Sequence, residues 1–273
     1  MNIINFLKTK KIVKILKQLI NLTLLKLGIK FHSYESITDL DSRKYISNFV
    51  KQIIDSKECQ ELKILIIGSP GMQELKSIPK KYLKKLNVTG VDYSEPQTIH
   101  KLSTNLKVKK YLFIKEDAFK YLSYTKDNKY DLIINRSFLH HISKKNKEIF
   151  INHCYRLISY SGKLFCIDWF IENYSNQIEL FNSISNYYTY RSKYTPALKN
   201  KMTTKKRDSA NFWWENMHAN HDFSGGKHAT REEMKKNLIN AGFNKNLFID
   251  IADRKKISNP YLWGHVMIVS SKY

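Results

Sequence analysis

The sequence predicts an α/β protein with a Rossmann-like, doubly wound and mostly parallel seven-stranded sheet that has helices on both faces. Two observations support this fold class. Between residues 61 and 170, short apolar runs alternate with stretches of helical spacing, which is typical of βαβ crossovers. A glycine or a polar residue also follows several of these runs, as expected where parallel strands end at a ligand-binding edge.

Five apolar runs indicate the parallel strands. The first is nearly continuous, as in a strand that is buried on both faces of a sheet. In chain order, the runs are 62–68 (LKILIIG), 87–94 (NVTGVDYS), 110–119 (KYLFIKEDAF), 130–142 (YDLIINRSFLHHI) and 162–170 (GKLFCIDWF). The stretch NKEIFINHCYRLI, which precedes the fifth run, has helical spacing and predicts the crossover helix.

The end of the chain completes the predicted sheet. Thr230 and Glu233 form a capping-box pattern, in which a hydroxyl and a carboxylate satisfy reciprocal backbone N–H groups. The helix that follows should end at Gly242, because glycine is the usual residue just past a helix C-terminus. Residues 246–252 and 262–271 predict two closing strands, an antiparallel pair at the sheet edge.

Four parts of the chain are expected. An N-terminal helical segment spans 1–58, and an α/β core spans 59–170. An insertion over 171–228 is rich in Tyr, Asn and Lys, breaks the α/β rhythm and should cap the ligand-binding edge. The core resumes over 229–273.

The N-terminal residues 1–30 carry seven lysines and no acidic residue. The lysines interrupt the apolar spacing too often for a membrane span. Three interpretations stay open: a helix that covers the core or the active site, a helix that lies on an anionic membrane surface, or a helix that binds a partner.

The net charge of +23 invites a nucleic-acid interpretation, but the composition weakens it. Only seven of the 47 basic residues are Arg, the better reader of phosphates and bases. Lys, Asn, Ile and Tyr are abundant and have A/T-rich codons, so codon bias could supply much of the positive charge. Nucleic acid is therefore not the expected partner. The three cysteines, Cys59, Cys154 and Cys166, show no zinc spacing or disulfide framework, which predicts a reducing, cytoplasmic location. The composition predicts no oligomeric state.

Several segments together resemble one enzyme family. Gly68 and Asp92 are 24 residues apart, close to the separation at which an acid after the second strand binds ribose hydroxyls. The segments VTGVDYS, KEDAF, YDLIINRSFLHHI, CYRLISYSGKLFCID and HATREEMKKNLINAGF follow in order. In this order and spacing, residues 60–170 and 229–273 resemble class I S-adenosylmethionine-dependent methyltransferases that modify small molecules.

The resemblance implies S-adenosylmethionine as cofactor. It implies a small molecule as methyl acceptor, in keeping with a role in the biosynthesis of a specialised metabolite. It implies that Asp92 binds the ribose and that Asp117 and Ala118 flank the adenine. Gly68 and Asn135 would hold the methionine portion through their backbone. The remaining candidates for cofactor binding are Ser69, Gly71 and Tyr93.

The loop after the first strand departs from the family pattern, which is acid-x-Gly-x-Gly-x-Gly. Ile66 replaces the acid, Pro70 the second glycine and Met72 the third, while Gly71 is one place out of step. Pro70 also removes one N–H donor. Pro70 and Gly71 nevertheless suit a type II turn, so we expect the turn to be kept and the methionine end of the cofactor to lose contacts.

Two other classes of function therefore stay open. The altered loop favours a methyltransferase-fold protein without methyl transfer, which serves as a binding subunit or catalyses another reaction. The charge favours an RNA methyltransferase, but the fourth strand lacks the Asn/Asp-Pro-Pro-aromatic sequence of many amino-group nucleic-acid methylases.

Three residues near the strand ends are the catalytic candidates. His140 and His141 follow the fourth strand, where the transferable methyl should lie, and an imidazole could bind the acceptor or act as a general base. The other interpretation is that one histidine packs under the sheet and the other caps the turn. Asp168, at the end of the fifth strand, could orient an acceptor hydroxyl or amine, or could instead cap a helix or form a surface salt bridge.

The insertion carries the candidates for acceptor binding. Aromatic side chains there could build a wall for an apolar or cationic acceptor, or could pack the insertion onto the sheet. These candidates are Tyr187, Tyr188, Trp213, Trp214 and His218. Glu215, His218 and His221 recur at intervals of three, which hints at a metal, but a single site would need a bent helix. No metal is therefore expected.

Overall fold

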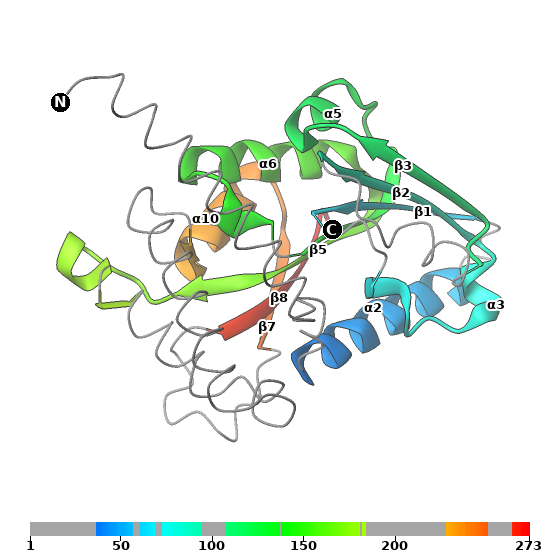
Figure 1. The fold of residues 1–273 in the computed structure, drawn as a ribbon, viewed down its shortest axis with the longest axis horizontal. Helices are drawn as coiled ribbons and strands as arrows, with labels where there is room; N and C mark the ends of the chain where they lie inside the picture. Colours follow the sequence, from blue (N-terminus) through cyan, green and yellow to red (C-terminus); the bar gives the residue numbers. More distant parts are fainter. Residues whose placement is uncertain are drawn as a thin grey trace, which may run out of the picture. The chain divides into compact units, whose positions relative to one another are not determined.

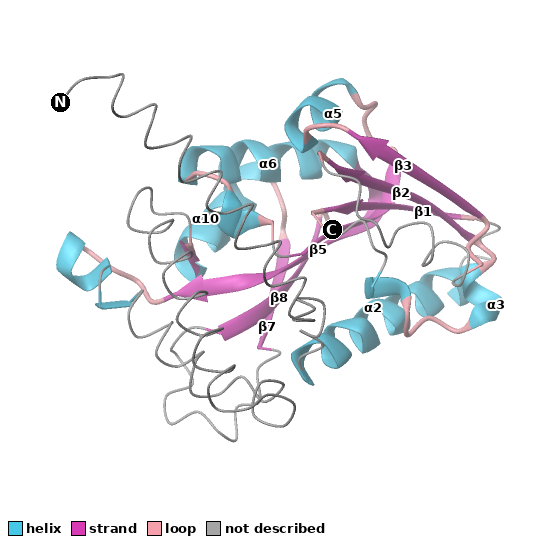
Figure 2. Ribbon diagram, in the orientation of Figure 1, coloured by secondary structure: helices cyan, strands magenta, loops and turns pink. Residues whose placement is uncertain are grey.

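A mostly parallel sheet with helices on both faces lies at the centre of the protein (Figures 1 and 2). Its strand order is β3-β2-β1-β4-β5-β8-β7, and the two-residue strand β6 pairs with β5 beside this path. The strands are β1 (Leu62–Ile67), β2 (Leu86–Asp92), β3 (Lys110–Lys115), β4 (Tyr130–Arg136), β5 (Ile158–Ile171), β6 (Ala229–Thr230), β7 (Lys245–Asp250) and β8 (Gly264–Ser271). The predicted fold class is confirmed, with β6 as an addition.

This computed structural model describes part of one compact unit, Ser36–Tyr273. The described residues are 37–56, 61–68, 73–93, 107–136, 138–180, 182–183, 228–250 and 264–273. The predicted N-terminal helix over 1–30, the loop 69–72 and most of the predicted insertion lie outside them. Within the described ranges, no helix combines the length and the apolar character needed to span a membrane.

The strand order reverses between β1 and β4. The chain builds β1, β2 and β3 toward one side of the sheet and then returns to add β4 and β5 on the other side. In such sheets, ligands bind beyond the carboxyl ends of the strands on either side of the reversal. The topology therefore places the expected ligand site at the carboxyl ends of β1 and β4.

Helices cover the two faces of the sheet in separate groups (Figure 1). One face carries α5, α6 and α10, and the other carries α2 and α3. The helices are α2 (Ile37–Ser56), η2 (Gln73–Leu75), α3 (Lys80–Leu83), α5 (Ala118–Tyr124), η3 (Leu139–His141), α6 (Lys144–Leu157) and α10 (Arg231–Ala241), of which η2 and η3 are 3₁₀ helices.

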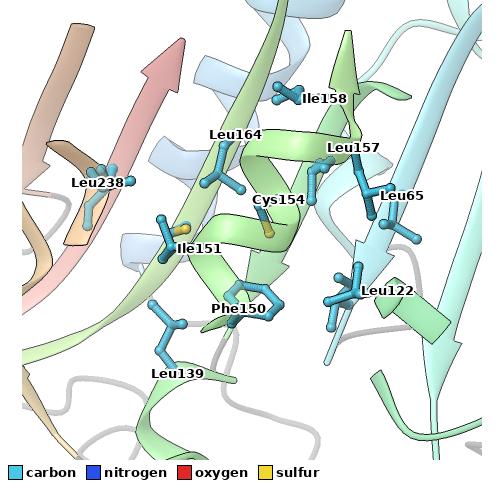
Figure 3. Close-up of a cluster of buried hydrophobic side chains, with 14 of the residues drawn as sticks. Leu65, Leu122, Leu139, Phe150, Ile151, Cys154, Leu157, Ile158, Leu164 and Leu238 are labelled. Carbon is cyan, nitrogen blue, oxygen red and sulfur yellow. The ribbon is translucent and has the colours of Figure 1, made fainter. Parts of the chain in front are cut away.

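Alternation along the buried strands explains this double layer. Successive side chains of a strand point to opposite faces, so a strand with apolar residues at every position feeds two cores. On β1, Leu65 belongs to the core under α6, whereas Ile64 belongs to the core under α2. Figure 3 shows Phe150 and Cys154 of α6 in the first of these cores, with residues of β1 and β5. Both cores lie against the strands that position the ligand-binding edge.

Two predicted strands are shorter than expected. The third ends at Lys115, because Asp117 accepts a hydrogen bond of 3.0 Å from the Lys120 backbone N–H and so starts helix α5. The fourth ends at Arg136, and the residues Leu139–His141 form the 3₁₀ helix η3. Local hydrogen bonding at these chain reversals therefore outweighs the β propensity of the flanking apolar residues.

The predictions for the end of the chain are confirmed. Thr230 and Glu233 form the capping box, with both reciprocal hydrogen bonds at 3.1 Å. Gly242 follows α10 in the left-handed conformation, with φ of 101°. The closing strands β7 and β8 are antiparallel, and β7 is the edge of the sheet.

Candidate active site

Gly68 begins the loop after β1, and its geometry admits only glycine. Its φ is +76°, and an added Cβ would lie 2.7 Å from the Cβ of Phe138. Phe138 is held in turn by Phe150, with ring centroids 5.1 Å apart. The first residue of the loop is thus packed against the segment that follows β4. The candidates Ser69 and Gly71 lie outside the described residues.

Asp92 lies next to Gly68 at the same edge of the sheet. Val91 is paired with Ile67, so the last residue of β2 stands beside the start of the loop. The Asp92 backbone carbonyl accepts a hydrogen bond of 3.0 Å from the Glu116 N–H, which fixes the turn after β3 against β2. The half-buried Asp92 side chain therefore lies at the end of β2, beside the start of the loop that follows β1.

Of the neighbouring candidates, Tyr93 and Asp117 are exposed and Ala118 is buried. Tyr93 follows Asp92 and is 79% exposed. Asp117 uses its Oδ1 to cap α5, so a role at the adenine would use its Oδ2. Ala118 is buried as the first residue of α5. The N–H of a first helical residue has no partner inside the helix and is available to a ligand.

Asn135 is a buried polar group in an apolar layer. It is 0% exposed, and in the described chain neither its Nδ2 nor its Oδ1 has a hydrogen-bond partner. It is paired with Ile67 of β1 and Cys166 of β5, at the edge where the strand order reverses. An unpartnered buried amide costs about 1–3 kcal/mol, so this side chain needs a partner from outside the described residues. The sequence suggested only a backbone role for this residue.

His140 and Asp168 form a buried pair. The His140 Nδ1 lies 2.7 Å from Asp168 Oδ1, and the two residues are 5% and 1% exposed. Asp168 Oδ2 accepts a second hydrogen bond of 2.7 Å from the Leu139 backbone N–H. The carboxylate therefore fixes both the start of η3 and the orientation of the His140 ring.

Lys147 holds the other end of this turn. Its Nζ donates to the carbonyl of Ile142 at 2.8 Å, and the residue is 2% exposed. The 3₁₀ helix η3 is thus fastened at both ends by buried charged side chains, Asp168 at its start and Lys147 at its end. A rigid turn of this kind suits a side chain whose position matters for chemistry.

Two further histidines flank the pair. The ring of His141, which is exposed, lies 4.0 Å from that of His140. His228 is 3% exposed and stacks on His140, with ring centroids 5.5 Å apart and planes inclined by 9°. Phe170 is paired both with β8 and with Ala229 of β6, so β6 and His228 lie on the side of β5 that faces β4.

One structural expectation about the site was wrong. Asp168 does not end its strand, because β5 continues to Ile171. Asp168 lies two residues beyond Cys166 on the same strand, so its side chain points to the same face of the sheet, the face that α6 covers. There it contacts His140. The chain beyond it pairs with β6 and β8, which is why the strand continues past Asp168. The sequence offered no signal for His228 as a neighbour of His140, since only the return of the chain at β6 brings it there.

The remaining candidates cannot be placed. Tyr187, Tyr188, Trp213, Trp214 and His218 all lie outside the described residues. Over the ranges that the structure does describe, no group of three His, Cys, Asp or Glu side chains is arranged to hold a metal ion.

The profile of the methyltransferase domain family matches residues 65–166. A search of curated proteins found no match. Among solved structures, the chain is similar to phosphoethanolamine N-methyltransferase 2 of Haemonchus contortus, solved with phosphomonomethylethanolamine and S-adenosylhomocysteine. The identity is 12% and the TM-score 0.51, over 82% of this chain and 52% of that one.

Two other solved structures are similar. A candidate sarcosine dimethylglycine methyltransferase of Galdieria sulphuraria is 9% identical, with a TM-score of 0.51 over 84% of this chain and 86% of that one. A candidate O-methyltransferase of Nostoc punctiforme is 18% identical, with a TM-score of 0.45 over 82% and 56%. The chain thus spans 52% and 56% of the Haemonchus and Nostoc chains, about half of each.

The matched residues run from β1 to β5 and include Gly68, Asp92 and Asn135. The resemblance noted in the sequence is confirmed by this match and by the shared fold. Residues 65–166 thus match a methyltransferase domain, and the chain folds as the doubly wound sheet that it shares with solved methyltransferases.

Proposed function

We propose that this enzyme transfers a methyl group from S-adenosylmethionine to a hydroxyl or amine of a small-molecule acceptor. The observation that carries the proposal is the buried pair of His140 and Asp168 on the α6 face of β4 and β5. It lies on the same face as the orphaned amide of Asn135, beside the strands that end at Gly68 and Asp92.

The described residues fit the cofactor. The positive φ of Gly68 lets backbone approach a ligand closely, and Asp92 can accept two hydrogen bonds from a ribose. The first N–H groups of α5, at Ala118, suit the adenine. The unsatisfied amide of Asn135 gains a partner if a ligand fills this edge. Bound there, S-adenosylmethionine would supply an already activated methyl group.

The protein's own contribution is positioning and proton removal. Asp168 accepts from the Nδ1 of His140, which leaves Nε2 of the neutral ring as a hydrogen-bond acceptor. An acceptor hydroxyl that donates to this Nε2 would lose its proton to it as the methyl is transferred. An acceptor ammonium would lose its proton to it first, because the nitrogen needs its lone pair to attack the methyl. The stacked ring of His228 limits the movement of His140 and excludes water from one side of it.

Several facts support a small acceptor. The Haemonchus structure holds phosphomonomethylethanolamine, and the Galdieria protein carries the name of a sarcosine dimethylglycine methyltransferase. The scarcity of Arg in the chain argues against RNA. A role in specialised metabolism and a cytoplasmic location are part of the proposal; Cys154 and Cys166 are free thiols, which suits a reducing compartment.

Calorimetry with S-adenosylmethionine and S-adenosylhomocysteine tests cofactor binding. Asp92→Ala removes a pair of charge-assisted hydrogen bonds and should weaken binding by about 30- to 1,000-fold, or about 2–4 kcal/mol. Asp92→Asn keeps the shape and one acceptor and should cost less. Asp127→Ala, which removes an exposed partner of Arg156, is the matched control and should leave binding unchanged. Binding that survives Asp92→Ala would place the cofactor elsewhere.

Methyl transfer is tested with S-adenosylmethionine labelled at the methyl group. We expect label to enter a small-molecule fraction of a cell extract and not purified total RNA, with His140→Gln reducing the rate. Label in RNA alone would overturn the small-acceptor proposal. Tight cofactor binding with label in neither fraction would favour the second candidate, a methyltransferase fold without methyl transfer, for which the Pro70 and Met72 substitutions in the loop are the evidence.

A further inference from the structure

Glu74 is a buried acid on the face of the sheet opposite His140. It lies in η2, two residues after the loop 69–72, and it is 1% exposed. Its Oε1 is 3.5 Å from Nη1 of Arg136, a long contact for an ion pair. Its Oε2 is buried and has no hydrogen-bond partner among the described residues. Burial of a carboxylate oxygen without a donor is costly, so this oxygen requires a donor that the described chain does not supply.

The position of this pair connects it to the ligand-binding edge. Arg136 is the last residue of β4, and Asn135 before it is paired with Ile67 of β1. Arg136 therefore stands beside Gly68, where the loop begins. A negative and a positive side chain thus lie together at the point where the resemblance to the family places the methionine portion of the cofactor.

The charges complement an amino-acid zwitterion. An α-ammonium offers three donors to a carboxylate oxygen, and an α-carboxylate offers two acceptors to a guanidinium. The loop itself has lost groups that the family pattern provides at this end of the cofactor. Ile66 stands in place of the acid, and Pro70 has no N–H. A substitute for both losses is therefore expected close to the loop.

We propose that Glu74 and Arg136 form the subsite for the aminocarboxylate end of S-adenosylmethionine. Oε2 of Glu74 accepts from the α-ammonium, and Arg136 binds the α-carboxylate. The inference rests on the proposed function, because it assigns residues to a cofactor whose binding is itself proposed. The competing explanation is a purely structural ion pair that fastens η2 to β4.

Two ligands that differ only at this end separate the explanations. S-adenosylhomocysteine carries the aminocarboxylate, whereas 5′-methylthioadenosine keeps the nucleoside and the thioether and lacks it. Calorimetry on the full chain should show that Glu74→Gln weakens S-adenosylhomocysteine about 10- to 100-fold and changes 5′-methylthioadenosine less than about twofold. Arg136→Gln should give the same selective loss. It serves as the second variant if Glu74→Gln does not fold, as judged by its unfolding in urea.

Glu61→Gln is the matched control. Glu61 is also an acid in an ion pair, with Lys109, but it precedes β1 at the opposite end of the strand. Its replacement should leave the affinity for both ligands unchanged.

The outcomes separate the inference from the proposed function. If wild-type protein binds S-adenosylhomocysteine but the variants weaken neither ligand, or weaken both equally, the subsite is wrong and the cofactor assignment stands. If wild-type protein binds neither ligand at millimolar concentration, the proposed function fails and the subsite fails with it.

Discussion

Replacing Asp168 with alanine should lower the free energy of unfolding by roughly 3–5 kcal/mol. The carboxylate is 1% exposed and accepts two hydrogen bonds of 2.7 Å, from the Leu139 N–H and the His140 Nδ1. Hydrogen bonds to a charged group contribute about 1.5–3 kcal/mol each, and alanine leaves both donors buried without a partner. The loss is a large part of the roughly 5–15 kcal/mol that stabilises a typical protein, so it should be evident in urea unfolding.

Asp168→Asn should separate stability from proton transfer. The amide oxygen can still accept from the Leu139 N–H, while the amide nitrogen must then donate to Nδ1 of His140. Both hydrogen bonds survive, so the expected loss of stability is only about 1 kcal/mol. The His140 ring is forced into the other tautomer, however, with its proton on Nε2. That nitrogen then donates where the proposed mechanism needs an acceptor, and methyl transfer should fall while cofactor affinity stays unchanged.

Three measurements on the same protein samples check this reasoning. Urea unfolding gives the stability, calorimetry with S-adenosylhomocysteine gives the cofactor affinity, and nitrogen NMR of the imidazole identifies the tautomer of His140. A variant Asp168→Asn with the Nε2–H tautomer and an undiminished rate of methyl transfer would refute His140 as the base. An Asp168→Ala protein as stable as wild type would refute the two buried hydrogen bonds.

Three other substitutions test the framework around the site. Gly68→Ala should cost about 1–3 kcal/mol in urea unfolding, because φ is +76° and the new Cβ would lie 2.7 Å from Phe138; equal stability would mean that the loop relaxes. Thr230→Ala should cost about 1 kcal/mol through loss of the cap with Glu233, and a cost of zero would count against the capping box. Burial lowers the pKa of His153 from 6.5, so stability present above pH 6.5 is lost as the pH falls through the lowered value. His153→Gln should flatten the fall in Tm between about pH 7 and pH 5, and an unchanged slope would contradict that assignment.

The sequence by itself determined the elements and their order. Strands buried on both faces leave nearly continuous apolar runs, so residues 62–67, in which only Lys63 is polar, could be recognised as a strand from their pattern. The cap of α10 at Thr230 and the stop at Gly242 are local hydrogen-bond and backbone patterns, and the structure confirms both. The position of Asp92 also follows from spacing, because a residue that ends a parallel strand lies at the ligand-binding edge whatever its distant neighbours are.

Only the tertiary structure decided which polar groups meet. Asp168 and His140 are 28 residues apart, and His228 comes from the far side of the predicted insertion. Their contact depends on the register of β4 against β5 and on the pairing of β6, and neither is encoded in a local pattern. The same holds for Glu74, whose approach to Arg136 spans 62 residues. The pairing of strands that are distant in the sequence decides which side chains are buried. Burial in turn determines which of the many polar side chains need a hydrogen-bond partner.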